Sequence, residues 1–171
     1  PLQYFMTPVA SAVNHGLVQK SYKRVSLVGL SGGGWAVTLY AAMDGRVGHT
    51  YQVGGTMPFY LRSPVSEAYK GHLGDFEQNW PDLIATANYL EMYVLGSVGK
   101  NRKQVQVINQ FDGVAAHGIK YQTYETEVAT RVASIGIGGS FSVLLDKENP
   151  EHSISDMALN FILKDLADGQ R

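Results

Sequence analysis

The sequence predicts an α/β fold, with a mainly parallel sheet of about four strands and flanking helices. Short apolar runs alternate along the chain with segments of ten or more residues that have helical spacing, which is typical of parallel strands joined by crossover helices. The run 25–30 is nearly continuously apolar, as expected for a strand covered on both faces of a sheet. The length of 171 residues fits one domain, so we expect residues 1–171 to form a single unit.

The expected elements follow in order along the chain. Strands are predicted over residues 25–30, 50–53, 105–111 and 141–145. Helices are predicted over residues 7–18, 35–43, 82–95, 119–134 and 153–166. The first helix is placed at Thr7-Pro8 because proline is favoured at the first helical position. Residues 58–80 are irregular and aromatic, and we interpret them as an excursion across the strand ends, where a cap over a site would lie.

Composition and charge exclude several classes of protein. Apolar residues make up 44% of the chain and charged residues 17%, which argues against a disordered chain. The net charge of −1 indicates neither a nucleic-acid nor a membrane partner, and no apolar run approaches the roughly 18 residues of a membrane span. The absence of cysteine excludes disulfides and thiolate nucleophiles in this sequence and leaves the compartment undecided.

The sharpest local signal is Gly29-Leu30-Ser31-Gly32-Gly33, a G-x-S-x-G match between a predicted strand and a predicted helix. A serine on such a tight turn has a strained backbone, and the residues two positions away must lack bulk so that the strand and helix can approach. Its hydroxyl is then exposed, and the N–H of Gly32 would point at a developing oxyanion. The alternatives are a plain glycine-rich turn and a phosphate cradle, although the Lys-Ser/Thr of a P-loop is missing.

A serine nucleophile needs a base and an acid that orients the base. Asp112 directly follows the third predicted strand, and His152 follows the fourth, so Ser31, Asp112 and His152 would meet at the carboxyl edge of the sheet. The alternative acids are Asp75, Glu77 and Asp146. The remaining histidines are interpreted as surface or capping residues: His15, His49, His72 and His117. No histidine pair and no H-E-x-x-H motif supports a metal site, and no cofactor is expected.

The stretch from about residue 24 to residue 166 resembles the C-terminal half of an α/β-hydrolase, of an esterase-like or peptidase-like kind. The resemblance rests on Gly29-Leu-Ser-Gly-Gly-Gly-Trp35, on Phe111-Asp112-Gly113 and on the run from His152 to Leu159. It implies that Ser31 is the nucleophile, that His152 is the general base and acid, and that Asp112 orients the histidine. The implied activity is hydrolysis of carboxylic esters or amides through an acyl-enzyme, with a small-molecule or peptide acyl substrate.

The match also departs from that family. The strands that normally precede the nucleophile strand are missing, and with them the usual second oxyanion donor, which leaves the Gly32 N–H. The outer edge of the strand at 25–28 would therefore lie open and apolar. We expect a domain of a longer protein, or a sheet completed by a partner chain or by a missing N-terminal half.

Two other functions remain open at this point. One is a non-catalytic binding or assembly module built on a hydrolase-like half, and the other is a nucleotide-binding α/β domain. If the chain is an esterase or peptidase, a substrate pocket is predicted, with walls from Trp35, Phe59 and Tyr60.

Overall fold

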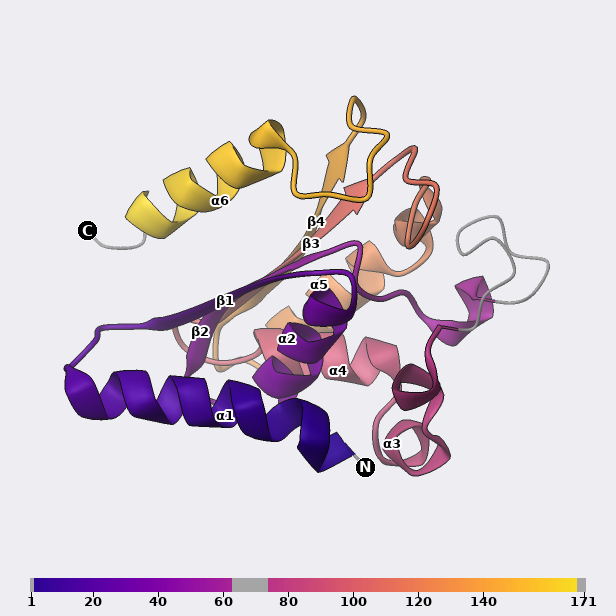
Figure 1. The fold of residues 1–171 in the computed structure, drawn as a ribbon. Coiled ribbons are helices and arrows are strands. Elements are labelled where there is room, and N and C mark those ends of the chain that lie inside the picture. Colours follow the sequence, from indigo (N-terminus) through magenta and orange to yellow (C-terminus); the bar gives the residue numbers. More distant parts are fainter. Residues whose placement is uncertain (1, 63–73, 169–171) are drawn as a thin grey trace.

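The computed structural model describes residues 2–62 and 74–168, which build one four-stranded parallel sheet. The strands lie in sequence order: β1 (Val25–Leu30), β2 (Val47–Val53), β3 (Lys103–Asn109) and β4 (Ser140–Asp146). This arrangement confirms the predicted fold class. Because all four strands run in the same direction, their carboxyl ends lie along one edge of the sheet (Figure 1).

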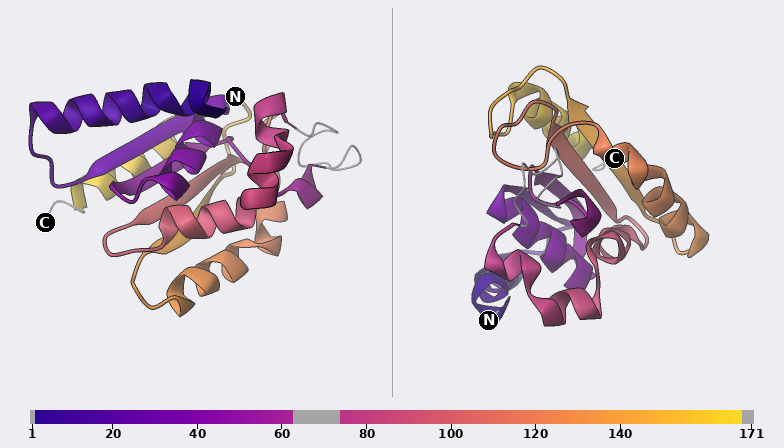
Figure 2. Two further views of the ribbon diagram at one scale, coloured as in Figure 1. Left: turned by 90° about the horizontal axis from the view of Figure 1, so that it is seen from below. Right: turned by 90° about the vertical axis from the view of Figure 1, so that its right-hand side faces the viewer.

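Helices cover both faces of the sheet, as Figures 1 and 2 show. One face carries α1 (Leu2–Gln19), α2 (Gly32–Met43), α4 (Tyr89–Ser97) and α5 (Glu125–Ser134), and the other carries α6 (Asp156–Asp168). Successive side chains of a strand point to opposite faces, so the central strands contribute to two cores. The smaller core, beneath α6, contains six buried residues: Tyr51, Val53, Val105, Val107, Ala158 and Ile162.

The first helix begins earlier than predicted. It starts at Leu2 and contains Pro8, so the placement of its start at Thr7-Pro8 is wrong. Pro8 has no N–H and cannot bond the carbonyl of Tyr4, a loss that normally disfavours proline inside a helix. Tyr4 is 75% exposed, so this part of α1 lies at the surface, where water can hydrate the free carbonyl.

The predicted helix at 82–95 is interrupted. The structure has α3 (Pro81–Thr86) and then α4, with Ala87 extended at φ −155°. Asn88 begins α4 through a capping box: its side chain accepts from the N–H of Glu91, whose carboxylate accepts from the N–H of Asn88.

The segments around the last two helices also differ from the expectation. The predicted helix at 119–134 is a 3-10 turn, η3 (Lys120–Thr123), followed by α5. The final helix begins at Asp156, because Ser155 Oγ accepts from the N–H of Ala158 as an N-cap. The expected excursion at 58–80 shows two short 3-10 turns at its ends, η1 (Phe59–Leu61) and η2 (Phe76–Asn79), and residues 63–73 lie outside the described part.

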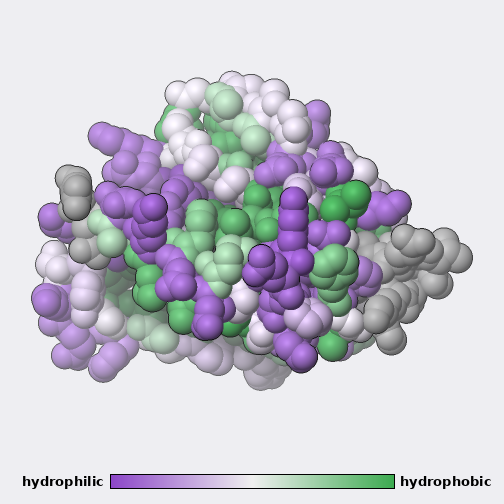
Figure 3. Space-filling model, turned by 90° about the horizontal axis from the view of Figure 1, so that it is seen from above, coloured by the Kyte–Doolittle hydropathy of each residue, from purple (hydrophilic) through white to green (hydrophobic). Residues whose placement is uncertain are grey.

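Strand β1 lies at the edge of the sheet and pairs only with β2 within the described residues. Val28 on this strand is 43% exposed. Seen from the side of α6, hydrophobic side chains gather in the middle of this face of the molecule (Figure 3).

None of the helices in the described ranges combines the length and the apolar character needed to cross a bilayer.

Candidate active site

Ser31 occupies a strained turn between β1 and α2. Its backbone has φ 56° and ψ −123°, a region that costs a residue with a side chain about 1–3 kcal/mol. The turn is held on both sides, because the Ser31 N–H donates to Val53 O at 2.9 Å and its carbonyl accepts from the N–H of Trp35 at 3.0 Å. These bonds fix the backbone of Ser31 at the carboxyl end of β1.

Two glycines, Gly29 and Gly34, let the strand and the helix approach each other at this turn. A Cβ at Gly29 would lie 2.2 Å from the carbonyl oxygen of Gly33, and a Cβ at Gly34 would lie 2.8 Å from Cα of Gly55. A Cβ at Gly33 would meet nothing within 4 Å, so the expectation that both residues two positions from Ser31 must lack bulk holds only for Gly29. The other position that cannot hold a side chain is Gly34, which packs against the backbone that follows β2.

The N-terminus of α2 supplies an N–H donor next to Ser31. Gly32 is the first residue of this helix, where the N–H groups have no acceptor within the helix itself. The residue is exposed, so its N–H can meet a bound molecule. The partial positive charge of the helix end adds to the attraction of any negative oxygen placed there.

Asp112 and His152, which are 40 positions apart in sequence, are in direct contact. Nδ1 of His152 lies 2.7 Å from Oδ2 of Asp112, whose side chain is fully buried. The other oxygen of Asp112, Oδ1, accepts from the N–H groups of Val114 and Ala115 at 2.7 and 3.2 Å. The loop after β3 thus fixes the carboxylate so that one oxygen faces the imidazole.

The far nitrogen of this imidazole, Nε2 of His152, is buried and has no hydrogen-bond partner among the described residues. A buried nitrogen without a partner is uncommon, because its desolvation is then not compensated. Gly54 lies against the Cε1–Nδ1 edge of the ring: a Cβ there would come within 3.3 Å of Cε1 of His152 and 3.6 Å of Oδ2 of Asp112.

A pocket of about 260 Å³ joins Gly54 to Ser31. Its described lining residues are Ser31, Gly54, Gly55, Gly74, Asp75, Gln78, Val114 and Ala115. Ser31 and Gly54 share this pocket, and Gly54 also adjoins the Asp112–His152 pair, whose own residues are not among the described lining. Among the residues that the structure describes, no hydrogen bond joins the Ser31 hydroxyl to His152.

The alternative acids do not reach the histidine. Asp146 accepts from the N–H groups of Glu148 and Asn149 and from Ser155 Oγ, within its own loop. Burial alone would raise the pKa of Asp146, but these hydrogen bonds outweigh burial and lower the pKa below its ordinary value of 3.8. Within the described residues, neither Asp75 nor Glu77 bonds to His152.

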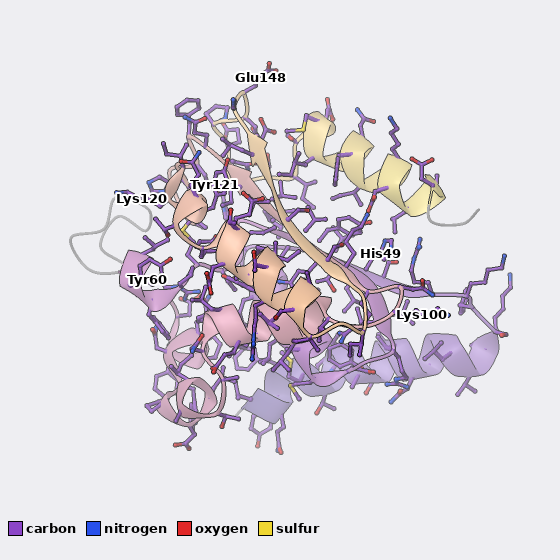
Figure 4. All side chains as sticks on the ribbon, turned by 180° about the vertical axis from the view of Figure 1, so that it is seen from behind. His49, Tyr60, Lys100, Lys120, Tyr121 and Glu148 are labelled. Atoms are coloured by element: carbon purple, nitrogen blue, oxygen red, sulfur yellow. The ribbon has the colours of Figure 1, made fainter. Side chains whose placement is uncertain are left out.

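The other described histidines lie apart from this pair. His15 is exposed on α1, and His117 bonds to the carbonyl of Ala115. His49 lies at the end of the sheet opposite to Glu148, which belongs to the loop that leads from β4 to His152 (Figure 4). His72 falls outside the described residues.

The three aromatic residues predicted as pocket walls lie away from the described lining of the Ser31 pocket. Trp35 is 1% exposed and packs edge-on against Phe5, with ring centroids 5.5 Å apart. Phe59 packs against Tyr89, and the Tyr60 hydroxyl bonds to Thr123 at 2.7 Å. These partners of the three side chains belong to α1, α4 and η3.

Two features of the site are not apparent from motif reasoning. Gly54, with φ 53°, provides the space into which the imidazole fits. Asn109, the last residue of β3, contacts the loop that carries His152. The sequence signals are faint: a Gly-Gly pair after β2, and an amide side chain at the end of a strand that already contains two other amides, Gln104 and Gln106.

Comparison with solved structures identifies the fold. The chain is similar to an acylaminoacyl peptidase from Pyrococcus horikoshii, with a TM-score of 0.62 and 10% identity over 95% of this chain and 27% of that one. It is also similar to Est1E from Butyrivibrio proteoclasticus, with a TM-score of 0.59 and 13% identity over 95% of this chain and 69% of that one. An acetyl xylan esterase from Paenibacillus sp. R4 matches with a TM-score of 0.51 and 13% identity, over 84% and 45% of the two chains.

The chain therefore has the α/β-hydrolase fold, and its neighbours in structure are esterases and peptidases. It spans about a quarter to seven tenths of the length of these three proteins. No protein-family model matches the sequence, and no curated protein matches it. At 10–13% identity the likeness concerns the fold, and the activity has to be argued from the site.

Proposed function

We propose that the protein is a serine hydrolase of carboxylic esters or amides, with Ser31 as the nucleophile, His152 as the general base and acid, and Asp112 as the orienting acid. One observation carries the proposal. The imidazole of His152 is held by Asp112 at Nδ1, and its other nitrogen, Nε2, is buried and has no partner among the described residues. The Cε1–Nδ1 edge of the ring lies against Gly54, which lines the same pocket as Ser31. Such an imidazole is oriented to take a proton from a hydroxyl.

The chemistry would proceed in two stages. Nε2 of His152 takes the proton of the Ser31 hydroxyl while Oγ bonds to the carbonyl carbon of the substrate, and the carbonyl oxygen becomes an oxyanion. The oxyanion then collapses, and the leaving alcohol or amine departs with the proton from His152, which leaves an acyl group on Ser31. Water, deprotonated by the same imidazole, attacks the acyl group, releases the acid and restores the serine.

Asp112 and Gly32 would stabilise the charges that develop in these steps. The buried carboxylate of Asp112 faces the imidazole, so it stabilises the imidazolium and fixes the proton on Nδ1. The N–H of Gly32 lies next to Ser31 and would donate to the oxyanion. Loss of one such donor typically costs on the order of 10²–10³ in kcat.

Covalent labelling tests the proposal without knowledge of the substrate. A fluorophosphonate should modify Ser31 alone, as identified by peptide mass spectrometry. We expect no label in Ser31→Ala, labelling slowed by about 10²–10⁴ in His152→Ala, and an unchanged rate in the control His15→Ala, which alters an exposed histidine of α1. A wild-type protein that stays unlabelled, or that is labelled at another serine, would contradict the assignment.

The open edge of β1 favours a second candidate, a binding or assembly module. We propose that a further strand, from a partner chain or from another part of a longer polypeptide, pairs with β1, whose outer side has no neighbour among the described residues and whose Val28 is 43% exposed. Val28→Lys should then reduce association measured by light scattering, while Ser31→Ala should leave it unchanged. A monomer with no bound polypeptide at all concentrations would exclude the partner chain.

A further inference from the structure

Asn109 is the last residue of β3, in register with Asp146 at the end of β4. Its side chain is buried, with the residue 1% exposed. Both hydrogens of its amide are in use: Nδ2 donates to the carbonyl oxygens of Glu151 and Ser153, each at 2.9 Å. These are the carbonyls of the two residues on either side of His152, so a single amide bridges the backbone from which the imidazole extends.

The main chain of Asn109 holds the other member of the pair. Its carbonyl oxygen accepts from the N–H of Asp112 at 3.1 Å, which closes the turn that leads to the buried carboxylate. The loop of Asp112 and the loop of His152 come from different strands, β3 and β4, and both are tied to this one residue. Asn109 therefore links the loop of the acid to the loop of the base.

The burial of this amide has a cost that its two donated bonds only partly offset. Oδ1 of Asn109 is buried and finds no donor among the described residues, and a buried unsatisfied oxygen costs about 1–3 kcal/mol. An apolar side chain of similar size would avoid that cost but would leave the carbonyls of Glu151 and Ser153 without these donors. The geometry thus favours a role in ordering the histidine loop over a role in packing.

We propose that Asn109 is a positioning residue, which holds the backbone on both sides of His152 so that the imidazole meets Asp112. Its effect on turnover rests on the proposed hydrolase function, whereas its effect on the Asp112–His152 contact does not. Asn149 reaches the same two carbonyls by longer bonds: its Nδ2 donates to Glu151 O at 3.2 Å and to Ser153 O at 3.5 Å. That residue is only half-buried, so its bonds compete with water.

The experiment compares the wild type with Asn109→Leu, which keeps the branched shape and the number of side-chain heavy atoms but removes both donors, and with Asn109→Ser, whose single hydroxyl can serve one carbonyl at most. The first readout is the proton NMR resonance of the His152 Nδ1–H, which lies far downfield when this hydrogen is bonded to a carboxylate. The second is hydrolysis of p-nitrophenyl acetate, with kcat and KM determined separately. The control is Tyr51→Phe, which removes a buried hydroxyl bonded to Asp165 beneath α6.

We expect the downfield resonance to be lost or broadened in Asn109→Leu and kcat to fall about 10²-fold, with KM within about twofold of the wild type, because misplacement of a catalytic group by about 1 Å has an effect of that size. Asn109→Ser should give a smaller fall in kcat. Tyr51→Phe should lose stability in urea but keep the resonance and kcat, which separates positioning from general destabilisation.

Two outcomes distinguish this inference from the proposed function. A folded Asn109→Leu or Asn109→Ser protein with a wild-type resonance and wild-type kcat would overturn the positioning role. A wild-type protein that shows the resonance but neither hydrolyses esters nor reacts with a fluorophosphonate would refute the hydrolase. In that case, loss of the resonance in either variant would still establish that Asn109 sets the Asp112–His152 contact.

Discussion

Replacement of Gly29 by alanine should disrupt the turn that presents Ser31. The new Cβ would lie 2.2 Å from the oxygen and 2.4 Å from the carbonyl carbon of Gly33, both of them backbone atoms of α2. Cβ atoms essentially never approach closer than 3.0 Å, so the strand and the helix would have to separate by about 0.8 Å. No side-chain rotation can relieve this contact, because neither partner is a side chain.

The expected loss of stability follows from that displacement. Overpacking typically costs about 1–3 kcal/mol, and a collision between two backbone segments belongs at or above the upper end of this range. We therefore expect Gly29→Ala to lower the free energy of unfolding by at least about 3 kcal/mol. Because the shift lies two residues from Ser31, fluorophosphonate labelling should slow by about 10²-fold even where the variant is folded.

Gly33→Ala is the matched control, since it adds the same methyl group four residues away. Its Cβ meets nothing within 4 Å, and alanine in a helix is favoured over glycine by about 0.5–1 kcal/mol. Urea unfolding followed by circular dichroism at 222 nm measures both variants. If Gly29→Ala were as stable as the wild type, or if Gly33→Ala were the more damaging change, the steric account of the turn would be refuted.

Ser31→Gly should raise the free energy of unfolding by about 1–2 kcal/mol in urea titrations, since glycine tolerates φ 56°, while Ser31→Ala should not. Burial, with smaller contributions from Arg24 and Lys103, lowers the pKa of His49 below 6.5. At such pH values His49 is protonated more readily in the unfolded chain than in the folded one. The free energy of unfolding should therefore fall as the pH drops below about 6.5, and it should fall less in His49→Gln. Asp146→Ala should cost about 2 kcal/mol, measured by thermal unfolding.

Much of the fold follows from local patterns in the sequence. The strand at 25–30 and the order of strands and helices are readable because alternating apolar runs reflect which faces are buried, a property of neighbouring residues. The local sequence pattern does not predict the interruption of the helix at Asn88 or the continuation of α1 through Pro8. A capping box competes with continued helix, and a proline is tolerated where water reaches the free carbonyl, so both depend on surroundings outside the local pattern.

The sequence by itself determined which residues to consider for the site. Ser31, Asp112 and His152 each follow a different strand, and parallel strands bring such positions to one edge of a sheet. Only the tertiary structure decided that the carboxylate of Asp112, rather than that of Asp146, faces the imidazole. The same holds for the contact of Gly29 with Gly33 and for the bridge that Asn109 makes across the histidine loop. The reason is physical: hydrogen bonds and steric contacts act over about 3 Å, and the atoms they join are brought together by packing rather than by proximity in the chain.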